Sequence, residues 1–437
     1  MPALLQRLDL RAITGDPGPH LPRPEVAGEG PVAAVRDILS QVKAGGDAAL
    51  TELTERFDGV RIEADRLRVP DAALHAALDA IAAPLRTAFE AARDAIAAYH
   101  RTQLHPDGRH DRNGVEIRDL RRAVARAGVY VPGGRAPLAS TVLMTAVPAK
   151  VAGVAQVVLC SPPQRDGEVA QAILAAAAIA GVDEVYRVGG AQAVAAMAYG
   201  TETVKPVDVI VGPGNAYVSI AKREVATEGR VAVTSAFAGP SEVVVIADDT
   251  TPVDAAAIDV IVQAEHGPDG LAWLVTWSEE AADRISDAVD TLTEKAPRRQ
   301  EIESTLAKNG YCVLVRDAAQ AVEVANAVAP EHLELMSVDP ESLVAHVKNA
   351  GAVFLGPFAP ASVGDYLAGP SHVLPTDRTA RFASGLRADD FCKHIHVVSL
   401  DQQALARVAP HVAAIAEAEG LAAHAESVRI RETGEFR

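Results

Sequence analysis

Residues 155–188 read AQVVLCSPPQRDGEVAQAILAAAAIAGVDEVYRV, and they give the clearest indication of the fold class. It opens with the apolar run AQVVLC, continues through an alanine-rich segment of helical pattern, and closes on a second short apolar run, EVYRV. A third run, VDVIVG, follows at 207–212, and the segment after it, AYVSIAKREVA, is again helical in pattern. Buried strands that alternate with helices predict a parallel sheet with helices on its faces.

A second region of this kind begins at residue 241 with the apolar run SEVVVIAD. Helical stretches separate it from two further runs, GLAWLVTWS at 270–278 and YCVLVRD at 311–317, and HLELMSV follows at 332–338. Short, continuously apolar runs are typical of strands that are buried on both faces. The sequence therefore predicts two α/β domains.

The segments outside these regions have other patterns. Residues 1–28 end in a stretch rich in proline and glycine, where a helix cannot persist, which indicates an arm and a linker. Residues 31–104 have apolar residues at helical spacing. The tail after residue 377 is charged, and its last helical stretch, 412–428, needs a partner surface to bury its apolar side. A second subunit would supply that surface.

The composition excludes several classes of function. A net charge of -17 over 437 residues argues against binding to nucleic acid or to an anionic membrane, because such partners need a basic face. The three cysteines, Cys160, Cys312 and Cys392, form no CxxC pair and suit a reducing compartment. With no signal peptide at the start of the chain and no apolar stretch long enough to span a bilayer, we expect a cytoplasmic protein.

The stretch QAEHGPDG at 263–270 brings side chains that bind metals or move protons to the end of a predicted helix over 252–266. Helical phase puts Asp259, Gln263 and His266 on one face and turns Glu265 roughly 200° away from Gln263. Two interpretations of this face remain open: a metal or substrate site, and a polar helix end in solvent.

A carboxylate and an imidazole stand side by side in VAPEHLELM. Pro330 ends the preceding helix, and the strand pattern begins directly after it, so Glu331 and His332 lie at a helix-to-strand junction. Such a pair could divide proton transfers between them, since imidazole titrates nearest to neutral pH. An exposed polar pair is the alternative.

Two more pairs occur further along the chain. Asp365 and His372 lie in VGDYLAGPSHVLPT, which we expect to be a rigid loop because of its glycines and prolines. Glu419 and His424 are five residues apart and cannot share a helical face unless Gly420 interrupts the helix. Without that interruption they are ordinary solvated helix residues.

Three glycine-rich turns each follow an apolar run: VYVPGGRAPL at 129–138, VGGAQAVAA at 188–196 and VGPGNAY at 211–217. The last two precede helical segments, whose exposed amides suit phosphate groups. None of them has the G-x-G-x-x-G spacing, so the usual dinucleotide fingerprint is absent and a nucleotide site is allowed without being demonstrated.

The cysteines suggest two further candidate sites. Cys392, His394 and His396 would share one face of a strand, which suggests zinc, although ordinary alternation produces the same spacing and no fourth ligand is near. Cys160 ends a strand, where the nucleophile of an aldehyde dehydrogenase could stand, and a buried inert thiol is the alternative.

Six ordered motifs closely resemble the histidinol dehydrogenase family, over residues 30 to 430. They are YVPGGRAPLASTVLMTAVPAKVAGV, GPGNAYV, AGPSEV, QAEHGPD, APEHLEL and GDYLAGPSHVLPT. The resemblance implies a zinc-dependent, NAD-linked enzyme of histidine biosynthesis that oxidises L-histidinol to L-histidine through an aldehyde and consumes two NAD+. It also implies a homodimer whose subunits each contain two Rossmann-like parallel-sheet domains.

The same resemblance assigns the domains. After an N-terminal arm at 1–28, residues 29–127 and 239–376 would form the catalytic domain, residues 128–238 the NAD-binding domain, and residues 377–437 a helical tail for dimerisation.

Carried over position by position, the resemblance also assigns the site. The zinc ligands would be Gln263, His266, Asp365 and His424, the last supplied by the partner subunit, and they would contact substrate as well. His332 would be the general base of the hydride-transfer steps, and Glu331 would activate the water that hydrates the aldehyde. Further contacts are expected from Ser241, His372 and Glu419 to substrate, with Glu419 supplied by the partner, and from Tyr130, Gln192 and Asn215 to NAD.

Two other functions compete with this assignment. One is an NAD-dependent aldehyde dehydrogenase that uses Cys160 as nucleophile. The other is a catalytically inactive, zinc-stabilised dimer that serves as a scaffold, an interpretation that the intact Glu331 and His332 pair opposes.

Overall fold

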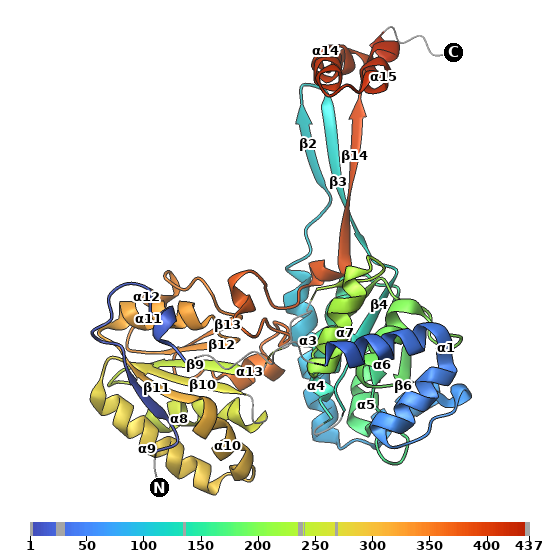
Figure 1. The fold of residues 1–437 in the computed structure, drawn as a ribbon. Helices are drawn as coiled ribbons and strands as arrows, with labels where there is room; N and C mark the ends of the chain where they lie inside the picture. Colours follow the sequence, from blue (N-terminus) through green and yellow to red (C-terminus); the bar gives the residue numbers. More distant parts are fainter. Residues whose placement is uncertain are drawn as a thin grey trace.

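The computed structural model describes residues 3–22, 31–133, 137–234, 239, 241–266 and 270–432, with the side chain of His266 outside the description. Figure 1 shows two α/β bodies side by side and an arm that projects from one of them. Each body contains one parallel sheet, and a third, antiparallel sheet forms the stem of the arm. The predicted α/β fold with two parallel-sheet domains is confirmed.

The first parallel sheet has five strands in the order β6-β5-β4-β7-β8. They are β4 (Arg126–Tyr130), β5 (Gln156–Ser161), β6 (Glu184–Arg187), β7 (Val209–Val211) and β8 (Ala232–Val233). Apart from β8 at the edge, these strands are almost entirely buried, as their continuous apolar runs predict.

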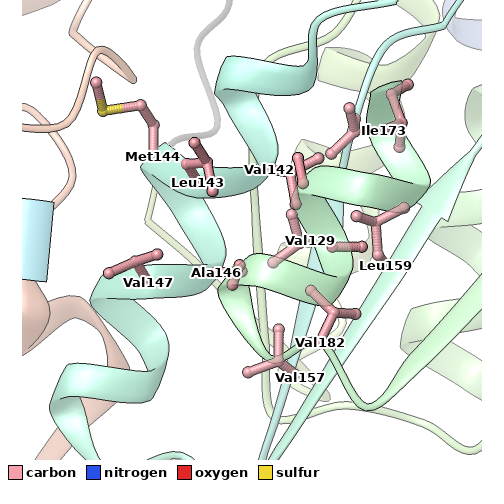
Figure 2. Packing of buried hydrophobic residues seen from close by; sticks show 14 of the residues in the cluster. Val129, Val142, Leu143, Met144, Ala146, Val147, Val157, Leu159, Ile173 and Val182 are labelled. Atoms are coloured by element: carbon pink, nitrogen blue, oxygen red, sulfur yellow. The ribbon is translucent and has the colours of Figure 1, made fainter. Parts of the chain in front are cut away.

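Helices cover both faces of this sheet. On one face lie α2 (Asp71–Ala80), α3 (Ala83–Arg101), α4 (Ala139–Ala152) and α5 (Gln171–Ala180), and on the other lie α1 (Val32–Asp58), α6 (Gly190–Tyr199) and α7 (Ala216–Thr227). Figure 2 shows apolar side chains of α4 and α5 packed against Val129 of β4 and Leu159 of β5. The core of this domain is therefore a three-layer sandwich.

The position of α1, α2 and α3 differs from the predicted grouping of residues 29–127 with residues 239–376. These helices share buried clusters with β4, β5 and β6 and so belong to the five-stranded body. The physical reason is that helical spacing specifies an apolar stripe without specifying which sheet covers it.

The second parallel sheet has six strands in the order β1-β11-β10-β9-β12-β13. They are β1 (Gln6–Asp9), β9 (Glu242–Ala247), β10 (Leu271–Thr276), β11 (Gly310–Leu314), β12 (His332–Met336) and β13 (Ala352–Leu355). One face is covered by α8 (Val253–Val262), α9 (Glu279–Lys295) and α10 (Arg299–Asn309), the other by α11 (Ala318–Val328) and α12 (Pro340–Val344). The predicted N-terminal arm thus adds β1 to the edge of this sheet.

The projecting arm combines two distant parts of the chain. β2 (Gly108–Arg112) and β3 (Val115–Ala123) form a hairpin, β14 (Cys392–Leu400) pairs antiparallel with β3, and α14 (Gln402–Ala418) and α15 (Ala422–Glu432) form the tip (Figure 1). The tail is therefore helical only at its end, because the alternating run CKHIHVVSL extends along β3 as a strand. At the tip, a small buried cluster of Ala413, Ala416 and Ala425 packs α14 against α15.

Short elements complete the chain. They are the helix α13 (Ala361–Tyr366) and the 3-10 turns η1 (Gly18–His20), η2 (Ala64–Arg66), η3 (Ala264–His266), η4 (Thr379–Arg381) and η5 (Ala388–Phe391). Within the described ranges, every helix is too short or too polar to serve as a transmembrane segment.

Each parallel sheet has one point where its strand order reverses. In the five-stranded sheet this point lies between β4 and β7, and in the six-stranded sheet it lies between β9 and β12. Ligands of open α/β sheets bind in the crevice at such points, ordinarily outside the carboxyl ends of the strands. The two switch points therefore mark the strands beside which a ligand site is expected.

Candidate active site

Glu331 and His332 lie where β12 begins, so the predicted helix-to-strand junction is confirmed. His332 pairs with Val243 near the start of β9, which places both residues at the switch point between β9 and β12. This is the amino-terminal edge of the six-stranded sheet rather than the usual carboxyl edge. Both side chains are buried, His332 at 2% and Glu331 at 8% exposure.

The backbone of one residue, Glu242, orients this pair. Its N–H donates to Oε2 of Glu331 at 3.2 Å, and its carbonyl oxygen lies 3.2 Å from Nδ1 of His332. Because a carbonyl only accepts, Nδ1 carries a proton, and Nε2 is the ring nitrogen left to exchange one. Ser241, the predicted substrate contact, directly precedes Glu242 at the same edge.

Asp365 and His372 join the pair from the α13 segment. The Nε2 atom of His332 lies 3.1 Å from Oδ1 of Asp365, and Nδ1 of His372 lies 2.9 Å from the Asp365 carbonyl oxygen. Asp365 is on the helix α13, so the loop predicted for it is wrong, whereas His372 does lie in a loop. Gly364 lies inside this helix, whereas Gly369, Pro370 and Pro375 of the quoted stretch come after Tyr366 and so leave the helix intact.

The carboxylates around His332 shift its proton affinity. Burial lowers the pKa of His332, but the charges of Glu331 and Asp365 outweigh that effect and raise the pKa to about 9. Burial raises the pKa of Glu331 to about 7, against the opposing influence of His332. Both groups therefore titrate within about two pH units of neutrality, as proton-transfer groups do.

A cavity of about 420 Å³ opens onto His332, Asp365 and His372. Its other wall includes Tyr99 and Gln103, which lie at the end of α3 and just after it and therefore belong to the five-stranded body. The cavity thus lies between the two domains, a common place for a small-molecule site.

The six-stranded sheet faces this cavity with its amino-terminal edge, and the five-stranded sheet with its carboxyl-terminal edge. Thr141 lies in the first turn of α4, just beyond the carboxyl end of β4, and its Oγ1 is 3.2 Å from Nε2 of His372. The amino edge of the six-stranded sheet is therefore next to the carboxyl edge of the five-stranded sheet. Each of the two switch points can contribute to one shared site.

Gln263 is the C-cap residue of α8 and is 1% exposed. Neither its Oε1 nor its Nε2 has a hydrogen-bond partner among the described residues. A buried amide without a partner is costly, so the side chain is suited to a ligand that the protein itself does not provide. The side chain of His266 and the predicted helix end at 267–268 lie outside the described residues.

Glu419 and His424 lie at the tip of the arm and are exposed. Glu419 is the C-cap of α14, and Gly420, with a φ of 74°, ends that helix before α15 begins. The interruption that the spacing requires is therefore present. Figure 1 shows the tip far from α13 of the same chain, so one subunit does not bring these residues to Asp365.

The three residues predicted to contact NAD all lie at the carboxyl edge of the five-stranded sheet. Tyr130 ends β4, Gln192 is in the first turn of α6 after β6, and Asn215 caps α7 after β7, its Oδ1 accepting from Val218 N at 3.2 Å. This edge contains the switch point between β4 and β7. The arrangement agrees with the binding place expected for an α/β sheet.

Contacts fix the glycine turns around Tyr130. Its hydroxyl accepts a hydrogen bond from Gly190 N at 3.1 Å. Gly212 has a φ of 107°, and a Cβ there would stand 2.2 Å from the Tyr130 carbonyl oxygen, so only glycine fits. Lys222 is fully buried on α7 and donates from Nζ to the Gly212 carbonyl at 2.7 Å. The turns are therefore held in place before any ligand arrives.

Cys160 is buried in the core of the five-stranded body, and burial raises the pKa of its thiol to about 12. Such a thiol is inert at neutral pH. We expect Cys160→Ala to keep wild-type turnover and to lower the free energy of unfolding by about 1 kcal/mol. Steady-state NADH production and urea denaturation would check this, and a loss of turnover by several orders of magnitude would instead support a thiol nucleophile.

Cys392, His394 and His396 do lie along one strand, β14, where His394 contacts Asp119 at 3.2 Å. In the part of the chain that the structure describes, however, no three His, Cys, Asp or Glu side chains are grouped as metal ligands within one subunit. These three residues are an exposed or half-exposed strand face.

Four residues that support the site belong to no motif from which their role could be predicted: Thr141, Lys222, Glu242 and Glu334. Two of them were detectable in principle, because Glu334 interrupts the buried run HLELM and Glu242 begins the buried run EVVVIA. A charged residue in such a run needs a specific partner. Thr141 has no such signal.

Two parallel-sheet domains, with a buried histidine and carboxylates on one edge and glycine turns on the facing edge, define an α/β enzyme whose site lies between its domains. The family model described as histidinol dehydrogenase matches residues 21–432. The chain belongs to the histidinol dehydrogenase family and is a dehydrogenase.

Relatives and a solved structure agree with this assignment. The histidinol dehydrogenase of Parasynechococcus marenigrum is 48% identical over 90% of this chain and 89% of that protein. The histidinol dehydrogenase of Vibrio parahaemolyticus is 46% identical over 94% of each chain. The crystal structure of histidinol dehydrogenase from Elizabethkingia anophelis is 33% identical, covers 99% of both chains and superposes with a TM-score of 0.94.

Proposed function

We propose that this chain oxidises L-histidinol to L-histidine through the aldehyde, reducing two NAD+ and using one zinc ion per site. Family membership supports the substrate. The observation that carries the chemistry is the buried His332, held between two carboxylates in a cavity whose other wall includes Tyr99 and Gln103 of the five-stranded body.

The residues present fit a zinc ion. The unpartnered amide of Gln263 supplies an oxygen, Asp365 a carboxylate, and His266 and His424 imidazoles, a nitrogen and oxygen set that suits zinc. When bound, zinc would orient the amine and imidazole of histidinol, and NAD+ would accept the hydride from the carbinol carbon.

His332 would take the hydroxyl proton as the hydride leaves. The Glu242 carbonyl keeps a proton on Nδ1, so Nε2, which points toward Asp365 and the cavity, is the accepting atom. If the Asp365 carboxylate bound a cation, it would raise the pKa of His332 less than the free carboxylate does. His332 would then more often be the neutral imidazole that a base requires.

Glu331 would activate the water for the second oxidation. An aldehyde has no hydride to give to a second NAD+ until water adds and forms the gem-diol. With its pKa raised to about 7 by burial, Glu331 can accept a proton from that water near neutral pH. The aldehyde oxygen would take back the proton that His332 received in the first step, which completes the gem-diol and returns His332 to its basic form. The second hydride would then leave to the second NAD+, His332 would accept the second hydroxyl proton, and the acid would be formed.

The remaining contacts divide between the two domains. We assign Ser241, His372 and Glu419 to substrate, supported by the position of Ser241 beside Glu242 and of His372 in the cavity wall. Tyr130, Gln192 and Asn215 are assigned to NAD. Tyr130 and Asn215 follow β4 and β7, the two strands of the switch point, and Gln192 lies beside Gly190, which donates to Tyr130. This arrangement supports that assignment and the NAD-binding role of residues 128–238.

A homodimer would complete the site. Glu419 and His424 stand on an arm that carries exposed apolar side chains, among them Ile395, Val398 and Ile415 at 44%, 59% and 63% exposure. Burying such side chains favours association with a second copy. The arm of one subunit would then supply Glu419 and His424 to the cavity of the other.

A cytoplasmic location fits this function. Cys160 and Cys312 are buried, Cys392 is half-buried, and all three are free thiols. Unpaired cysteines suit a reducing compartment.

The ratio of NADH produced to L-histidinol consumed tests the proposal. We expect two NADH for each L-histidine formed, because both oxidations occur at one site before release. The ratio would be measured by absorbance and amino-acid analysis on zinc-loaded protein. A ratio of one would contradict the four-electron reaction, and no NADH at all would favour the inactive scaffold.

A further inference from the structure

Two buried carboxyl groups lie close to the site but do not belong to the predicted set of metal ligands. Asp259 on α8 is 5% exposed and Glu334 on β12 is 1% exposed. The two carboxyl groups are within hydrogen-bonding reach of each other. Two buried carboxylates that close cannot both be ionised, so one proton lies between them.

Glu334 also holds the beginning of α13. Its Oε1 accepts a hydrogen bond from Ala361 N at 3.0 Å, and Ala361 is the first residue of that helix. His332, two residues earlier on the same face of β12, contacts Asp365 near the other end. Glu334 and His332, which alternate along β12, therefore hold the beginning of α13 and a residue near its end.

Asp259 links the Glu334 carboxyl group to α8. It precedes Gln263 by one helical turn and lies on the same face. A path of hydrogen bonds thus runs from the helix that carries Gln263 to the helix that carries Asp365.

We propose that Asp259 and Glu334 are positioning residues, a hydrogen-bonded pair that fixes α8 and α13 relative to each other and so places Gln263 and Asp365 for one metal ion. The pair binds neither metal nor substrate. This inference rests on the proposed zinc site and goes beyond it, since it assigns a function to two acids that the ligand set leaves out. Burial raises the pKa of Glu334 to about 9, in agreement with a proton held between the two groups.

The test compares Glu334→Leu with Glu334→Gln. Leucine removes both hydrogen bonds at similar volume, whereas glutamine keeps its Oε1 as acceptor for Ala361 and donates from Nε2 to Asp259. We expect Glu334→Leu to weaken zinc binding roughly 10- to 100-fold, the usual loss when a group that orients a ligand is removed. Glu334→Gln should stay within about threefold of wild type.

Zinc affinity would be measured by competition with a chromogenic chelator, and ligand geometry by the visible spectrum of the cobalt-loaded dimer. Hydrogen exchange adds a readout that needs no metal: Glu334→Leu should speed the exchange of the Ala361 amide. Leu335→Val is the matched control, since Leu335 is buried on the opposite face of β12 and its truncation disturbs the strand without touching the pair.

Asp259→Leu is the second variant, should Glu334→Leu fail to fold. It leaves the bond between Glu334 and Ala361 in place, breaks only the link to α8, and should also weaken zinc binding. Unchanged zinc affinity in both leucine variants would overturn the inference, and so would a loss in Glu334→Gln as large as in Glu334→Leu. Wild-type protein that binds no zinc would instead refute the proposed function.

Discussion

Replacing His332 by glutamine should lower kcat for L-histidinol oxidation roughly 10³-fold, within the range that a general base contributes. Glutamine keeps a hydrogen-bonding group beside Glu242 and Asp365 but has no nitrogen that accepts a proton near neutral pH. Both hydride transfers need that acceptor, so neither product should accumulate. Stopped-flow and steady-state NADH production would measure the effect.

Two controls separate the chemistry of His332 from structure. Zinc content and the unfolding midpoint should stay at wild-type values, because glutamine fills a similar space in the buried position. His346→Gln, at an exposed histidine remote from the cavity, should leave kcat unchanged. If His332→Gln retains more than a tenth of wild-type kcat with full zinc content, another group is the base.

Mixing two inactive variants should restore activity if the arm crosses to the partner. A His424→Ala subunit lacks the proposed ligand at its arm tip, and a Glu331→Ala subunit lacks the water-activating carboxylate. In a heterodimer, the cavity of the first would receive the intact arm of the second, which gives one working site of two. We therefore expect about half of the wild-type activity per heterodimer.

The experiment requires heterodimers isolated with two different affinity tags after unfolding and refolding together. Each homodimer, treated identically, should be nearly inactive and sets the background. Should the purified heterodimer remain at that background, His424 serves the cavity of its own chain, and the arm would have to fold back. The exposed position of His424 at the tip argues for the crossing.

Much of the fold could be predicted from the sequence because its strands are continuously apolar. Runs such as SEVVVIAD are buried on both faces, and only a parallel sheet between helices does that. The packing partners of α1, α2 and α3 could not be predicted in the same way. An apolar stripe specifies burial, and either sheet could have provided it.

The candidate site, like the fold, could be predicted from the sequence only in part. The junction at Glu331 and His332 could be predicted from Pro330 and the change of period. Its position opposite the five-stranded body could not, since that depends on how the two domains face each other. The link between Asp259 and Glu334 depends on contacts across α8 and β12 that no local pattern encodes. Helical phase correctly grouped Asp259 with Gln263, and only the tertiary structure gives Asp259 a partner.

The stem of the arm sets an order of events during protein synthesis. Asp119 on β3 contacts His394 on β14, and the two are 275 residues apart in the chain. At the usual rate of translation, β3 would wait roughly 15 to 55 seconds on the ribosome for the strand that completes its sheet. Both α/β bodies can fold during that interval, whereas the arm tip forms last. If active sites are shared as proposed, a nascent chain stays inactive until it is released and meets a second copy, and the proposed aldehyde intermediate would not form on unfinished protein.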